Sequence, residues 1–71
     1  MDQGDTKEKL RVLLNHWVEH NIGHAREFTE WAEKSRQLGQ GRVYHDIVQA
    51  ARRMEEVNEF LLAALEELKE A

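Results

Sequence analysis

The first half of the chain places three histidines at four-residue steps: His16, His20 and His24. Side chains four residues apart are neighbours on a helix, so this series brings imidazole rings together. Imidazole nitrogens combined with carboxylates suit zinc, nickel, cobalt, copper and non-haem iron. One interpretation is therefore a divalent transition-metal site. His20 and His24 would be ligands, and Glu27 or Glu55, together with a symmetry mate, would complete the coordination shell.

No recognisable catalytic motif surrounds these histidines. The His20–His24 pair lacks the glutamate of the H-E-x-x-H motif, which supplies the general base of zinc proteases. The Glu-x-x-His pair of di-iron bundles is replaced by Asn21-x-x-His24. The chain has no cysteine and no glycine-rich phosphate loop, and Ser35 has no evident base partner. We therefore expect a protein that is not an enzyme.

The same region also supports a structural interpretation. If the chain folds back about residues 40–41, residues whose numbers sum to about 82 face each other across a helical hairpin. His24 then faces Asn58, and Asn21 lies one helical turn before His24. A polar layer of Asn21, His24 and Asn58 within an apolar seam sets register and oligomeric state through hydrogen bonds. The metal site and the polar layer remain alternatives at this point.

A long helix is predicted to carry these residues. Large side chains recur every seven residues and enclose one histidine: Leu10, Trp17, His24, Trp31 and Leu38. This repeat predicts a helix over about residues 6–38, with the column pointing into a helical core. Asp5 and Glu8 form a capping-box pattern at its start, and Gly39 suits a left-handed cap at its end.

A second amphipathic segment follows a turn at residues 39–41 and spans about residues 42–69. Its apolar face alternates steps of three and four residues: Tyr44, Ile47, Ala51, Met54, Asn58, Leu61, Leu65 and Leu68. Two long helices joined by a short turn pack antiparallel. The sequence therefore predicts an all-α fold, with one helical-hairpin domain over residues 1–71.

Both predicted helices have apolar faces wider than one partner helix can cover. Exposed apolar strips of this kind mark interfaces, so we expect a homodimer that forms a four-helix bundle. The expected interface residues are Leu14, Trp17, Phe28, Trp31, Ile47, Met54, Leu61 and Leu65. Residues 34–53 contain five basic side chains and one acid, whereas residues 55–71 contain six glutamates and one lysine. Pairing of these opposite charges favours an antiparallel dimer.

Composition argues against several other partners. A formal net charge of −4 disfavours non-specific nucleic-acid binding, which needs many cationic phosphate contacts. No apolar run approaches the roughly 20 residues that cross a membrane, and the N-terminal sequence lacks the apolar core of a signal peptide. We therefore expect a cytoplasmic protein whose partner is a second copy of itself. The one cofactor that the sequence suggests is a divalent transition-metal ion.

Short prokaryotic proteins of unknown function carry a comparable pattern on their first helix, HWxEHNxxHAxEFxxWA. The chain resembles them through His16-Trp17-x-Glu19-His20-Asn21-x-x-His24-Ala25-x-Glu27-Phe28-x-x-Trp31-Ala32. The resemblance implies a helical-hairpin protein, and it brings no established activity with it.

Overall fold

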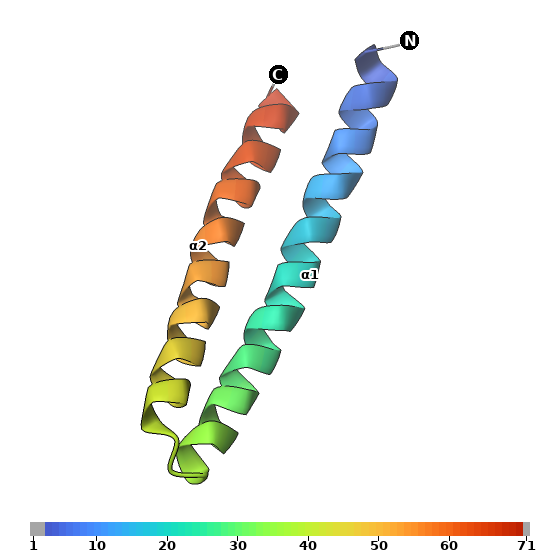
Figure 1. Ribbon diagram of the computed structural model, residues 1–71. Coiled ribbons are helices and arrows are strands. Elements are labelled where there is room, and N and C mark those ends of the chain that lie inside the picture. Colours follow the sequence, from blue (N-terminus) through green and yellow to red (C-terminus); the bar gives the residue numbers. More distant parts are fainter. Residues whose placement is uncertain (1–2, 71) are drawn as a thin grey trace.

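The computed structural model describes residues 3–70, which form two long helices joined by a tight turn (Figure 1). Helix α1 comprises Gln3–Gln37 and helix α2 comprises Gly41–Glu70. The helices run antiparallel and side by side, and both free ends lie opposite the turn (Figure 1). This arrangement confirms the predicted all-α helical hairpin. Residues 1, 2 and 71 of the predicted domain lie outside the described residues.

The first turns of α1 differ from the prediction. The described chain is helical from Gln3 onward, so Asp5 and Glu8 lie inside the helix and do not cap it. Asp5 pairs with Lys9 at 3.6 Å, and the Arg11 guanidinium donates to Glu8. The capping-box prediction is therefore wrong, because both acids pair with cations one turn further along the helix.

The turn is a Schellman motif built around Gly39. The Gly39 N–H donates to the Arg36 carbonyl and the Gln40 N–H to the Ser35 carbonyl, each at 3.0 Å. Gly39 has a φ of 79°, a left-handed conformation that costs a residue with a Cβ about 1–2 kcal/mol. This confirms the predicted left-handed cap. Helix α2 begins two residues later, and the Tyr44 N–H donates to the Gln40 carbonyl at 2.9 Å.

A seam of buried and half-buried residues joins the two helices. On α2 these residues include the whole predicted series, together with Val48 and Gln49: Tyr44, Ile47, Ala51, Met54, Asn58, Leu61, Leu65 and Leu68. On α1 the series shares only His24 with the predicted column: Leu14, Val18, Asn21, His24, Ala25, Phe28, Ala32 and Ser35. The packed surface of α1 is thus rotated by about one helical position relative to the prediction.

The heptad column that contains the two tryptophans borders this seam and does not form it. Trp17 is 41% exposed and Trp31 is 58% exposed. Ala25 is half-buried and Ala32 is buried in the seam where the column was expected. Small side chains let two helices approach closely, whereas an indole between them would force them apart. The prediction that this column points into the core is therefore wrong for the hairpin itself.

A hydrogen-bonded asparagine pair fixes the register near the middle of the hairpin. Asn58 is only 9% exposed, and its amide donates to the Val18 carbonyl at 3.1 Å. Its side-chain oxygen accepts a hydrogen bond from the Asn21 amide at 3.0 Å. Asn58 therefore lies opposite Val18 and Asn21, where the sequence predicts His24. The predicted register is wrong by about one helical turn, because the chain reverses around Gly39, earlier than expected.

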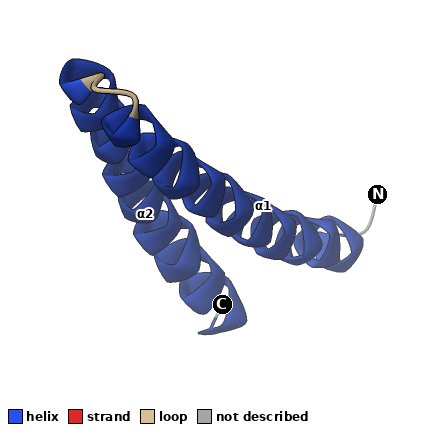
Figure 2. Cartoon of the chain, turned by 90° about the horizontal axis from the view of Figure 1, so that it is seen from below, coloured by secondary structure: helices blue, strands red, loops and turns tan. Residues whose placement is uncertain are grey.

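The hairpin is elongated and encloses only a small core. Its principal extents are 55 × 15 × 14 Å, and its radius of gyration is 16.4 Å, against about 11 Å for a compact domain of this length. The free ends of the two helices diverge away from the turn (Figure 2). Among the described residues, the buried apolar side chains are Leu14, Val18, Ala32, Ala51 and Leu65. Much apolar surface therefore faces solvent.

Replacement of Asn58 by alanine should lower the free energy of unfolding by about 1–3 kcal/mol. The change removes two hydrogen bonds and leaves a gap between the helices. Asn21→Ala should cost about 1 kcal/mol, because it removes one hydrogen bond at a partly exposed position. Urea denaturation followed by circular dichroism at one fixed protein concentration measures both changes.

Combining the two substitutions measures the contact itself. The double mutant should reveal a coupling energy of about 0.5–1.5 kcal/mol. Ser35→Ala is a matched control, because the Ser35 hydroxyl donates only within α1, to the Trp31 carbonyl at 2.8 Å. It should show no coupling to Asn58→Ala. Strict additivity of Asn21→Ala and Asn58→Ala would contradict a stabilising role for the pair.

Candidate functional site

The three histidines of α1 form a ladder of rings along one side of the helix. The His16 and His20 rings stack with centroids 5.9 Å apart, and the His20 and His24 rings meet edge to face at 4.4 Å. The Nε2 atoms of His20 and His24 are 2.9 Å apart. At this distance one imidazole donates a hydrogen bond to the other, or both lone pairs point toward a common cation. The structure therefore brings together the two predicted histidine ligands.

The two predicted carboxylate ligands do not join this Nε2 pair within one chain. Glu27 Oε1 lies 4.0 Å from His24 Nδ1, the ring nitrogen that does not contact His20. Glu55 instead lines a groove together with Ile22. Within residues 3–70, no group of three or more His, Cys, Asp or Glu side chains is placed to hold a metal ion. One hairpin thus supplies two imidazole ligands and no complete site.

The predicted polar layer forms only in part. Asn21 and Asn58 are hydrogen bonded across the seam, whereas His24 contacts the rings of His20 and Phe28 on its own helix. His24 belongs to the column beside the seam, so it does not reach Asn58. The asparagine pair and the histidine pair are therefore separate polar features. The first is inside the hairpin, and the second lies at its surface.

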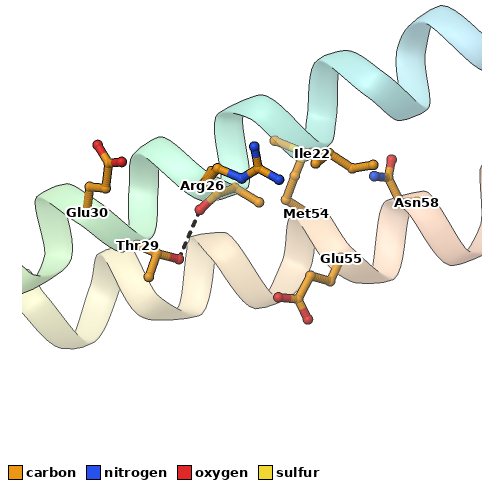
Figure 3. A pocket seen from close by; sticks show the side chains of 8 residues that line it. Ile22, Arg26, Thr29, Glu30, Met54, Glu55 and Asn58 are labelled. Carbon is orange, nitrogen blue, oxygen red and sulfur yellow. Dashed lines mark hydrogen bonds between the residues drawn. The ribbon is translucent and has the colours of Figure 1, made fainter.

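An open groove follows one side of the seam (Figure 3). Its lining comes from both helices: Ile22, Ala25, Arg26, Thr29 and Glu30 of α1 and Met54, Glu55 and Asn58 of α2. The Thr29 hydroxyl donates to the Ala25 carbonyl at 3.0 Å, and the carboxylates of Glu30 and Glu55 point away from each other (Figure 3). Because Ile22, Thr29 and Glu55 all line this groove, they lie on the same side of the hairpin.

On α1, the heptad column lies on the flank away from this groove. Ile22 and Thr29 border one edge of the seam, and Trp17, His24 and Trp31 border the other edge, about 150° around the helix. The column that contains Trp17, His24 and Trp31 has a second column next to it, which includes His20 and Glu27. Together the two columns form a series at steps of three and four residues, here called the outer stripe: Leu10, Leu13, Trp17, His20, His24, Glu27, Trp31, Lys34 and Leu38. Helix α1 therefore carries two stripes with helical spacing, one of which packs on α2.

Helix α2 extends the apolar surface beside the outer stripe. Because Glu55 faces the groove, the column that starts at Val43 and includes Val57 lies on the opposite edge of the seam. Phe60 adjoins this column and is 77% exposed. The exposed apolar residues of both helices on this side are here called the apolar flank: Leu10, Leu13, Trp17, Trp31, Leu38, Val43, Val57 and Phe60.

The residues predicted for an oligomer interface divide between the seam and the apolar flank. Leu14 and Leu65 are buried inside the hairpin. Four others are half-buried in the seam: Phe28, Ile47, Met54 and Leu61. Only Trp17 and Trp31 lie on the apolar flank. The predicted set does not include the other six residues of the apolar flank, although the spacing of the outer stripe identifies those of α1.

Ion pairs among the described charged residues lie mainly within single helices. A hydrogen bond from Arg11 lowers the pKa of the Glu8 carboxyl, and a hydrogen bond from Arg36 lowers that of Glu33. These exposed pairs contribute little to stability. Lys34 lies beside the apolar flank, with its Nζ 4.2 Å from the centre of the Trp31 ring. Its charge is therefore held at the turn end of the outer stripe.

No helix within residues 3–70 is long and apolar enough to cross a membrane. No curated protein and no solved structure matches the chain significantly. Residues 10–68 match a family described as Domain of unknown function (DUF8180). The matched region includes the histidine ladder, the turn and most of both helices, and it agrees with the expected resemblance to proteins of unknown function. The chain belongs to the DUF8180 family.

Proposed function

We propose that this protein is a structural assembly module, in which two hairpins pack through their apolar flanks and form a four-helix bundle. The observation that carries the proposal is the apolar flank itself. Trp31 is 58% exposed, Leu38 and Phe60 are each 77% exposed, and all three lie on one side of the hairpin. Contiguous apolar surface of this kind marks an interface.

A second copy of the chain fits this surface because of the two stripes on α1. The hairpin of residues 3–70 is about 15 Å across, so each helix covers only one face of the other. The outer stripe of α1 therefore has no covering helix within residues 3–70. Two-fold packing of the flanks places the outer stripe of one α1 against the same stripe of its partner. The three- and four-residue spacing of this stripe is the spacing that packed helices require. The dimer therefore covers both flanks with one interface.

Charge favours an antiparallel arrangement of the two hairpins. The turn end contains Lys34, Arg36 and Arg42, and the last third of α2 is rich in glutamate. When the hairpins lie antiparallel, the glutamate-rich end of one α2 lies beside the basic start of the partner's α2. A parallel pair places like charges together, which disfavours that arrangement. From the apolar flank we infer a structural role without catalysis, with a protein partner and not a membrane. The net charge of −4 disfavours a nucleic-acid partner.

Sedimentation equilibrium tests the dimer directly. The 8.4 kDa chain should sediment with about twice its mass, and Trp31→Glu should convert it to a monomer, because a buried carboxylate would face the partner's apolar flank. Leu62→Glu is the matched control, because Leu62 is 50% exposed and lies on the groove side of α2. It should leave the dimer intact. A monomeric wild type, or a dimer disrupted by Leu62→Glu and not by Trp31→Glu, would contradict the proposal.

Disulfide formation between single-cysteine variants tests the orientation, since the natural sequence has no cysteine. Val43→Cys chains mixed with Glu67→Cys chains should cross-link, because an antiparallel pair brings the start of one α2 beside the end of the other. Val43→Cys mixed with Lys34→Cys is the opposing arm. Preferential cross-linking of that second mixture would show a parallel dimer, because only that arrangement aligns the two turn ends.

A further inference from the structure

The histidine pair lies at the centre of the proposed interface. His20 is the middle residue of α1, which spans Gln3–Gln37. His24 follows one turn later and separates Trp17 from Trp31 in the outer stripe. When the two α1 helices of the proposed antiparallel dimer overlap along their full length, the two-fold axis crosses α1 at this level. Two copies of the pair then face each other between flanking tryptophans and leucines.

The geometry of the pair suits coordination of one ion by both rings. Zinc and related ions bind imidazole nitrogen at about 2.0–2.1 Å, so two nitrogens 2.9 Å apart subtend roughly a right angle at the ion. This is the angle between adjacent ligands in octahedral and square-planar sites, which nickel and copper adopt. A tetrahedral zinc site needs a slightly wider separation of about 3.3 Å, which small ring rotations provide. Little rearrangement is therefore needed.

A carboxylate stands behind the pair on the side away from the Nε2 atoms. Glu27 Oε1 lies 4.0 Å from His24 Nδ1. Metal-binding histidines commonly donate their second ring N–H to a carboxylate, which fixes the tautomer and leaves the other nitrogen free for the metal. A small rotamer change brings Glu27 from this separation into hydrogen-bonding distance, which suits an orienting residue and differs from its predicted role as a ligand. The negative charge of Glu27 also offsets that of a buried cation.

We propose that two copies of this chain bind one divalent transition-metal ion through the Nε2 atoms of His20 and His24 from each copy. The inference rests on the proposed dimer, because one hairpin within residues 3–70 offers no third ligand. Four neutral imidazoles complete the shell of a borderline metal such as nickel, copper or zinc. The ion would link the two outer stripes at their midpoint and so add to the stability of the dimer.

Calorimetric titration of chelator-treated, tag-free protein with nickel and with zinc tests this site. The expected stoichiometry is one ion per two chains. His20→Ala and His24→Ala should each weaken binding at least tenfold, and Glu27→Ala should weaken it about tenfold because the orienting carboxylate is removed. His45→Ala is the matched control, because this exposed histidine lies near the turn beside Asp46. It should bind nickel and zinc as the wild type does.

The same titration separates the metal site from the dimer. A wild-type dimer that takes up neither nickel nor zinc overturns the metal site and leaves the dimer standing. Equal loss of binding in His45→Ala and His24→Ala also overturns the site. One ion per chain on a protein that sediments as a monomer overturns both the bridging site and the dimer. One ion per two chains, lost in His24→Ala and kept in His45→Ala, supports the site.

Discussion

Close packing of α1 on α2 through small side chains determines what the rest of the molecule exposes. Ala32 and Ala51 are buried in the seam, and Ala25 is half-buried there. Such residues allow the two helix backbones to approach each other, and they leave no room for an indole. The tryptophans of α1 are therefore displaced to one edge of the seam. They join the aliphatic column of α2 on the apolar flank, and this surface is the basis of the proposed dimer.

The hairpin contains two polar pairs, one between its helices and one on the outer stripe of α1. The Asn21–Asn58 pair lies inside the hairpin, where its hydrogen bonds tie the register of the helices to one position. A buried amide is costly unless it is paired, so registers that separate these residues are disfavoured. The His20–His24 pair lies on the outer stripe beside the seam, where His24 is half-buried. Its partners come from its own helix and, in the proposed assembly, from a second copy.

The sequence pattern predicted the helices, the Gly39 cap and most of the packed surface of α2. For α1 it could not choose between two stripes with the same spacing of three and four residues. The column with Trp17 and Trp31 has the larger side chains, so size pointed to the wrong stripe for the hairpin core. The choice depends on how closely two particular helices pack, which periodicity does not describe. The error in the predicted register has a similar origin. The numbers of two facing residues add up to twice the number at the centre of the turn, so moving that centre by one residue changes the sum by two.

The histidine pair was predictable and its surroundings were not. Spacing of four residues was sufficient to bring His20 and His24 into contact. Glu55 is separated from His20 and His24 because it lies on the opposite edge of the seam. The edge that each residue occupies can be assigned only when the packed surface of α1 is known. The family match over residues 10–68 includes the histidine pair and Glu55, and it assigns no activity to them.

Tryptophan fluorescence during dilution tests most directly whether a second copy covers the apolar flank. The two tryptophans, Trp17 and Trp31, are the only ones in the chain, and both lie on this flank. At high concentration their emission should be blue-shifted and protected from iodide quenching. On dilution below the dimer dissociation constant, emission should shift to the red and quenching should increase. Red-shifted, readily quenched emission at every concentration would contradict the account.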